Sequence, residues 1–252
     1  MTKTLLSNSS PEVALFNAAR AGDSVKLKAL IDANVNIHER MSMGSTVLHC
    51  CASAGDVASI LTLIEAGAVV DLADDDGCTP LHLSALGGET EVARVLIQNG
   101  ADVNAKDNDD WTALHWVGDS SYIETALVFI ESGTQLEAKD NKEGQTALHM
   151  ASRCGFYEFV QALINGGANI DSIDNAGRVA LHYAAMKGHR EVVSALLGAD
   201  AIIDAKDLSG QTPMELGIEN DMNDAVAVIQ AHVASRAVEK MLAQVHKPRS
   251  MG

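Results

Sequence analysis

Apolar residues along most of the chain recur at the spacing of short amphipathic helices. In the segment ETEVARVLIQN, for example, Val92, Val95 and Leu96 lie on one face of a helix. The segment before it, TPLHLSALGG, opens on a threonine that can cap a helix and closes on glycines that end one. Gly100 then supplies the left-handed backbone needed to leave the second helix, and a turn rich in Asp, Asn and Gly follows. The pattern predicts two short helices and an extended turn.

This two-helix pattern repeats along the chain. Five histidines, each directly after a leucine, are spaced by 33, 33, 34 and 33 residues: His49, His82, His115, His149 and His182. The turns repeat in the same phase, as GAVVDLAD, GADVNAKD, GTQLEAKD, GANIDSID and DAIIDAKD. Phe16 and Glu215 occupy the histidine position one period earlier and one period later. Because units this short cannot bury their apolar faces alone, they predict a stack with a continuous core.

Seven units in phase fill almost the whole sequence. We expect an N-terminal tail over residues 1–10, a repeat domain over 11–240, and a C-terminal helix end and tail over 241–252. The expected repeats are approximately residues 11–42, 43–75, 76–108, 109–142, 143–175, 176–208 and 209–240. Asp110 and Asp200 stand at positions where sister units carry glycine. We expect both in the left-handed region, which Asp tolerates better than most residues.

The motifs TPLH and GADVNAKD carry a resemblance to a known family. A helix-turn-helix unit of this period with these motifs resembles the ankyrin repeat, over almost the whole chain. The resemblance implies an all-α solenoid whose first helices line a concave face and whose units are joined by β-hairpin-like turns. It implies a non-catalytic protein-protein interaction module, acting as a scaffold or as a stoichiometric inhibitor or chaperone, with no cofactor. It also assigns the repeated histidines hydrogen bonds to the backbone of their own and adjacent turns.

The charge of the chain narrows the choice of partner. The sequence has 34 acidic and 18 basic residues, a formal net charge of −16. Because an acidic protein repels phosphate backbones, we expect a protein partner, with a basic patch, and no nucleic acid. Four cysteines without C-x-x-C spacing indicate a reducing compartment, and no apolar run approaches the length of a membrane span. These features favour a cytoplasmic monomer; a nuclear location, or secretion as an effector, stays open.

Neither catalysis nor metal binding is indicated. The carboxylate pairs Asp75–Asp76 and Asp109–Asp110 fall at expected hairpin tips, where water is not excluded and catalytic pKa shifts are not expected. Stacked repeats separate the histidines by about 8–10 Å, too far to share one metal ion. We therefore expect no catalytic residue and no metal site.

A protein-binding surface is expected in repeats three to five. Non-core positions of successive units face the same way there, and residues 71–110 carry ten acidic and two basic residues. This excess of acidic residues has two interpretations. It forms a solvated surface that keeps the stack soluble, or it forms a negative rim that steers a basic partner. The candidate partner-binding residues are Asp75, Asp76, Leu86, Asp109, Asp110, Trp111, Asp119, Ser120, Arg153, Arg178, Met186 and Lys187.

Both tryptophans of the chain lie in the stretch DDWTALHWVGD. Sister units place Ser, Cys, Gln and Arg at the position of Trp111, which predicts a surface residue and an anchor for a cationic side chain. At the position of Trp116 the sister residues are Cys, Leu, Met and Tyr, which predicts a mostly buried indole.

The end of the chain predicts a long helix. No Gly or Pro interrupts the sequence after the seventh unit until Pro248, and Val226, Ile229, Val233, Ala237 and Met241 recur at helical steps toward Val245. One interpretation is a cap that covers the exposed edge of the last repeat. The alternative is a second docking surface, which would make the protein an adaptor or a secreted effector or targeting factor that recruits a client.

Overall fold

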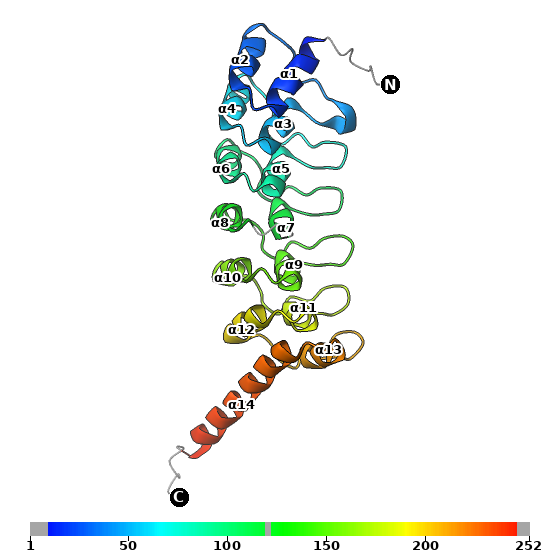
Figure 1. The fold of residues 1–252 in the computed structure, drawn as a ribbon, viewed down its shortest axis with the longest axis vertical. Helices are drawn as coiled ribbons and strands as arrows, with labels where there is room; N and C mark the ends of the chain where they lie inside the picture. The colour runs from blue at the N-terminus through cyan, green and yellow to red at the C-terminus, as the bar shows by residue number, and fades with distance from the viewer. Residues whose placement is uncertain (1–9, 119–121, 246–252) are drawn as a thin grey trace, which may run out of the picture. The chain divides into compact units, whose positions relative to one another are not determined.

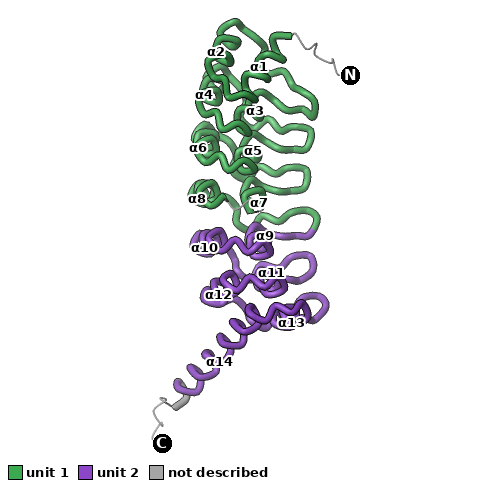
Figure 2. Tube along the Cα trace, in the orientation of Figure 1, with its two compact units in different colours: residues 1–142 green, residues 143–252 purple. Residues whose placement is uncertain are grey.

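The structure, a computed structural model, describes residues 10–118 and 122–245. These residues form fourteen α-helices and one short 3-10 turn, and none of them lies in a strand. The all-α prediction is confirmed. The chain divides into two compact units, residues 1–142 and 143–252, each of which we describe by itself (Figure 2). The division falls between the expected fourth and fifth repeats.

Unit 1 contains four helix pairs. Each second helix buries apolar side chains and is followed, two residues after its end, by a left-handed residue, as the sequence pattern predicts. The helices are α1 (Pro11–Arg20), α2 (Ser24–Asp32), α3 (Val47–Ser53), α4 (Val57–Glu65), α5 (Pro80–Gly87), α6 (Thr90–Gln98), α7 (Ala113–Gly118) and α8 (Ile123–Glu131), with the 3-10 turn η1 (Ser42–Gly44) before α3.

Unit 2 contains three helix pairs, the last of which ends in a much longer helix. They are α9 (Ala147–Cys154), α10 (Tyr157–Asn165), α11 (Ala180–Lys187), α12 (Arg190–Gly198), α13 (Pro213–Glu219) and α14 (Asn223–Val245). In both units the first helices of successive pairs pack together in one layer and the second helices in another (Figure 1). Each pair begins inside one of the seven expected repeats, whose outer limits stay a prediction.

The hairpin turns are joined to one another at their tips. In unit 1 the backbone N–H of Asn108 donates to the carbonyl of Asp76 at 3.0 Å, and its side-chain amide donates to the carbonyl of Asp75 at 3.0 Å. A Cβ on Gly77 would lie 2.7 Å from the nitrogen of Asn108, so only glycine permits this approach. Asp110, in unit 1, and Asp200, in unit 2, have φ of 61° and 67°, which confirms the left-handed geometry expected of both.

The repeated histidines bind one repeat to the next. Nδ1 of His82 accepts the backbone N–H of Thr79 at 3.1 Å, and Nε2 donates to the carbonyl of Trp111 at 3.1 Å. The same bond to a carbonyl 29 residues downstream is made by His49, His149 and His182. This bonding requires a neutral ring with its proton on Nε2, and it confirms the structural role expected for these imidazoles.

Helix α14 is a single helix of 23 residues, as the apolar periodicity predicts. Its first turns cap the last repeat, because Ala225, Val226 and Ile229 are buried against the preceding helices. Beyond Ile229 the helix leads away from α12 and α13 (Figure 1), and Val233 and Met241 are 46% and 67% exposed. The expected stripe therefore covers the edge of the repeat only as far as Ile229.

Candidate protein-binding surface

An aspartate organises four of the hairpin turns. In unit 1, Oδ1 of Asp107 accepts the backbone N–H groups of Asp109 and Trp111, both at 2.9 Å. Carboxylate bonds of this kind fix the turn that leads into the next first helix. The same pair of bonds, to the N–H groups two and four residues on, is made by Asp74, Asp174 and Asp207.

The second oxygen of Asp107 positions the tryptophan pair. Oδ2 of Asp107 accepts the indole N–H of Trp116 at 2.9 Å. Trp111 stands edge-on to Trp116, with ring centroids 6.5 Å apart and planes at 87°, an arrangement that aromatic quadrupoles favour. Trp116 lies edge-on to His82 as well, at 6.1 Å. Both indoles are therefore held in place from within unit 1.

Each of the two indoles is half-buried. Trp116 was expected to be a mostly buried residue, and the structure leaves only part of it in solvent while its N–H reaches Asp107 in the hairpin. Trp111 was expected at the surface, and its ring keeps part of its area in solvent while the rest packs on Trp116. The pair presents a fixed, partly solvated aromatic surface.

Acidic residues lie on the hairpin tip that carries Trp111 and on the tip before it. Asp75 and Asp76 are exposed on the preceding tip, which Asn108 joins to the tip that carries Trp111. We call Asp75, Asp76, Asp109, Asp110 and Trp111 the Trp111 surface. Leu86, at the end of α5, is 50% exposed.

Two of these carboxylates have a lysine neighbour. Asp109 accepts a hydrogen bond from Nζ of Lys142 at 2.7 Å, which raises the pKa of that lysine. Lys106 lies 3.7 Å from Asp110. Both pairs are largely solvent-exposed, so a cationic group of a partner can compete for these carboxylates.

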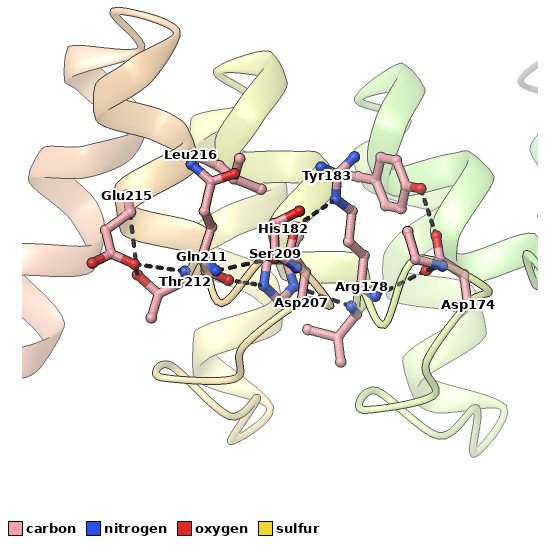
Figure 3. A network of polar contacts seen from close by, with 12 residues as sticks. Asp174, Arg178, His182, Tyr183, Asp207, Ser209, Gln211, Thr212, Glu215 and Leu216 are labelled. Carbon is pink, nitrogen blue, oxygen red and sulfur yellow. Dashed lines mark hydrogen bonds and ion pairs between the residues drawn. The ribbon is translucent and has the colours of Figure 1, made fainter.

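In unit 2 the corresponding positions form an internal polar network (Figure 3). The hydroxyl of Tyr183 donates to Oδ2 of Asp174 and accepts from the side-chain amide of Gln145 at 2.8 Å. Burial, followed by the bond to Asp174, raises the pKa of Tyr183 to about 12. Arg178 donates to Oδ2 of Asp207 at 3.1 Å and lies over the ring of Tyr183. Arg178 is thus engaged within the unit, which leaves less of it for a partner than the sequence suggested.

The remaining candidates of unit 2 are less engaged. Arg153 lies 3.8 Å from Glu143, and its side chain is 34% exposed. Met186 is half-buried and Lys187 is exposed, both at the end of α11. Asp119 and Ser120 lie outside the described residues. The structure thus brings together the predicted tip residues of unit 1, and places four further candidates in unit 2.

Sequence reasoning missed the residues that hold the surface. Asp107 and Asp174 close the quoted turn motifs, so their recurrence was a signal, but the partner of each second oxygen varies from turn to turn. Across residues 10–118 and 122–245, no group of three His, Cys, Asp or Glu side chains is arranged to hold a metal ion. None of the helices in the described part of the chain combines the length and apolarity of a membrane span.

Comparison with known proteins identifies the family. The family model described as "Ankyrin repeats (3 copies)" matches residues 62–140, 127–207 and 167–236, and the single "Ankyrin repeat" model matches residues 43–75. The chain belongs to the ankyrin-repeat family. Domains of this family are generally protein-protein interaction modules and are typically non-catalytic.

Solved structures show the same fold. The human ASB11 ankyrin repeat domain is 23% identical, with a TM-score of 0.77 over 86% of this chain and 96% of that one. The ankyrin repeat domain of Bcl-3, described as a unique member of the IkappaB protein family, is 24% identical, with a TM-score of 0.77 over 86% of this chain and 97% of that one. A search of curated proteins finds no match.

Proposed function

We propose that the protein is a non-catalytic binding module that holds a partner protein on its hairpin tips and first helices. It acts in the cytoplasm as a scaffold or as a stoichiometric inhibitor or chaperone. The family supports the general role, and the four free cysteines, three of them buried, support a reducing compartment.

The observation that carries this proposal is the fixed tryptophan pair in the acidic part of unit 1. An indole that is already held in one orientation loses little conformational entropy when it is covered by a partner. Trp111 has this property, because Trp116 supports its ring and Asp107 holds the indole of Trp116. Aromatic residues of this kind are enriched among the residues that dominate binding energy.

The acidic surroundings favour a cationic side chain in the partner. An Arg or Lys can lie over the face of Trp111 while it pairs with the carboxylates of Asp76, Asp109 or Asp110. The net charge of −8 over residues 71–110, from ten acidic and two basic residues, also steers a basic protein toward this part of the chain.

Replacement of Trp111 tests the proposal. We expect Trp111→Ala to weaken partner binding by about 2 kcal/mol, close to 30-fold, with a folded structure retained. Partners are captured by chemical cross-linking from cell extract and identified by mass spectrometry, and the affinity of each is then measured with purified protein. Tyr157→Ala, an aromatic truncation at a 40% exposed position of α10, is the matched control. Equal binding by wild type and Trp111→Ala would place the site elsewhere.

A second candidate function is that of an adaptor or effector that recruits a client through α14. The observation that favours it is the exposed second half of this helix, where Val238 and Leu242 are each 55% exposed and Met241 is 67% exposed. A chain that lacks residues 236–252 and keeps its partner on the Trp111 surface, but loses a client, would support this role. If the shortened chain keeps both its partner and its client, the adaptor function is contradicted.

A further inference from the structure

The second half of α14 carries an apolar face that the described part of unit 2 leaves exposed. Val238, Met241 and Leu242 follow one another at steps of three and one residues, so their side chains lie on one side of the helix. Their exposed fractions, between 55% and 67%, contrast with 0% for Ile229 earlier in the same helix. We call this face, Val238, Met241 and Leu242, the tail face.

The tail face belongs to the only strongly basic part of the sequence. Residues 231–252 contain four basic residues, Arg236, Lys240, Lys247 and Arg249, and one acidic residue, Glu239, for a net charge of +3. The rest of the chain has 14 basic and 33 acidic residues, a net charge of −19. The tail therefore has the opposite charge to the rest of the molecule and carries exposed apolar side chains beside its cationic ones.

These are the features that the Trp111 surface is expected to bind. That surface offers a partly exposed indole for an aliphatic or cationic side chain and four carboxylates for Arg or Lys. We propose that the tail face of one molecule docks on the Trp111 surface of a second copy of this chain, so that the protein associates head to tail. This inference rests on the proposed function, since it uses the same surface, and it replaces the expectation of a strict monomer.

Charge selects this arrangement over its alternatives. Two tails that paired with each other would bring +3 against +3, and two Trp111 surfaces would bring acidic residues together. An anionic membrane would attract the tail but repel the rest of the chain, whose net charge is −19. A tail on the Trp111 surface of another molecule is the arrangement in which the charges on both sides are complementary.

The association is expected to be weak. A helix end of this length covers less than the about 1,200–2,000 Å² that stable interfaces bury, which predicts dissociation constants in the micromolar range or above. A contact between two different surfaces leaves a free tail and a free Trp111 surface on the dimer, so larger assemblies form as concentration rises.

Sedimentation velocity over a range of concentrations, at about 50 mM and about 500 mM NaCl, tests the proposal with the full chain. We expect concentration-dependent association whose constant falls at least about tenfold at the higher salt concentration. The double variant Val238→Gln, Met241→Gln keeps the charge and a helix-forming composition and is expected to be monomeric. Val25→Gln, at an 82% exposed valine of α2, is the matched control and is expected to associate like wild type.

A mixing experiment separates head-to-tail association from a symmetric dimer. Trp111→Ala alone is expected to be monomeric, and so is the tail double variant alone. An equimolar mixture of the two is expected to form a 1:1 dimer, because one chain keeps an intact tail face and the other an intact Trp111 surface. If Trp111→Ala does not fold, Asp76→Lys takes its place. This variant keeps the indole and reverses one charge, and it is expected to give the result described for Trp111→Ala.

Three outcomes would overturn the proposal. They are a monomer at every concentration, a dimer that survives Trp111→Ala, and a mixture that stays monomeric although wild type associates. Binding of the wild-type monomer to phosphatidylserine vesicles, with no self-association, would assign the tail to a membrane instead. The proposed function has a separate readout: Trp111-dependent binding of another protein by a chain that never self-associates would leave that function intact.

Discussion

At the scale of single residues, two aspartates of the hairpin turns do more than shape their turns. Asp107 uses one oxygen for two backbone N–H groups and the other for the indole N–H of Trp116. Asp174 makes the equivalent backbone bonds and gives its second oxygen to the hydroxyl of Tyr183. The two sites differ in one chemical respect, because an indole N–H can only donate whereas a hydroxyl can also accept.

This difference predicts unequal effects of the same substitution. In Asp107→Asn the new amide N–H₂ faces either the indole N–H or the two backbone N–H groups, so at least one donor is left without an acceptor. We expect a loss of about 1–3 kcal/mol in the free energy of unfolding of unit 1, measured by urea denaturation followed by tryptophan fluorescence. In Asp174→Asn the hydroxyl of Tyr183 can accept from the new amide as well as from Gln145, so the two side chains stay bonded and only the O–H loses its acceptor; the matched loss is expected to be smaller. A larger loss at Asp174 would contradict this account.

The sequence predicted these residues only in part. The recurring Asp at the end of each turn motif marked a structural position, but Trp116 lies nine residues after Asp107 and its side-chain orientation depends on the folded hairpin. Comparison with apolar sister residues therefore predicted a mostly buried indole at position 116, but not its hydrogen bond to Asp107. The same limit applies to Arg178, whose bond to Asp207 joins residues 29 apart in sequence.

At the scale of elements, periodicity predicted the helices well, because each needs a buried face at helical spacing. Burial could not be predicted in the same way for α14. Its apolar residues continue at the same steps past Ile229, but burial depends on whether a neighbouring helix still lies beside them. The structure shows that α12 and α13 cover only the first turns of α14 (Figure 1).

We therefore expect changes in the buried first turns of α14 and in its exposed second half to affect stability differently. Deletion of residues 236–252 is expected to change the free energy of unfolding of unit 2 by less than about 1 kcal/mol. The described side chains it removes are exposed, and the ion pair between Arg236 and Asp200 is a surface pair. Ile229→Ala is expected to cost about 2–5 kcal/mol, because this side chain is fully buried.

Thermal and urea denaturation of both variants measure the difference. Unfolding or aggregation of the deletion variant at temperatures where wild type is folded would show that the second half of α14 is part of the cap. Equal losses of unfolding free energy in the deletion variant and in Ile229→Ala would also show that the second half belongs to the cap.

At the scale of the whole molecule, stability depends on pH through the repeated histidines. Burial lowers the pKa of His49, His82 and His182, since a charged ring would lose water and place a proton on Nδ1 opposite a backbone N–H. Their pKa values in the unfolded chain are close to 6.5. The unfolded chain therefore binds more protons than the folded chain below that pH.

The linkage predicts a loss of stability on mild acidification. The contribution of these histidines is fully present above pH 6.5 and is lost as the pH falls below 6.5 toward their folded pKa values. We expect the melting temperature to fall between pH 7 and pH 5, measured by circular dichroism at constant ionic strength. The slope of the unfolding free energy with pH gives the number of protons taken up. A melting temperature that does not change over this interval would contradict the prediction.

The histidine bonds also give the stack a direction. Each of these imidazoles donates to a carbonyl of the repeat that follows it and accepts a backbone N–H of its own repeat. Glu215 ends this series, because its carboxylate bonds to Thr212 in its own repeat and to no later turn among the bonds described. Removing a repeat from the C-terminal side therefore deprives the preceding histidine of its acceptor, whereas removing one from the N-terminal side deprives no remaining histidine. A shortened protein is therefore better made by deleting repeats from the N-terminus, so that the last repeat, which contains Glu215, is kept.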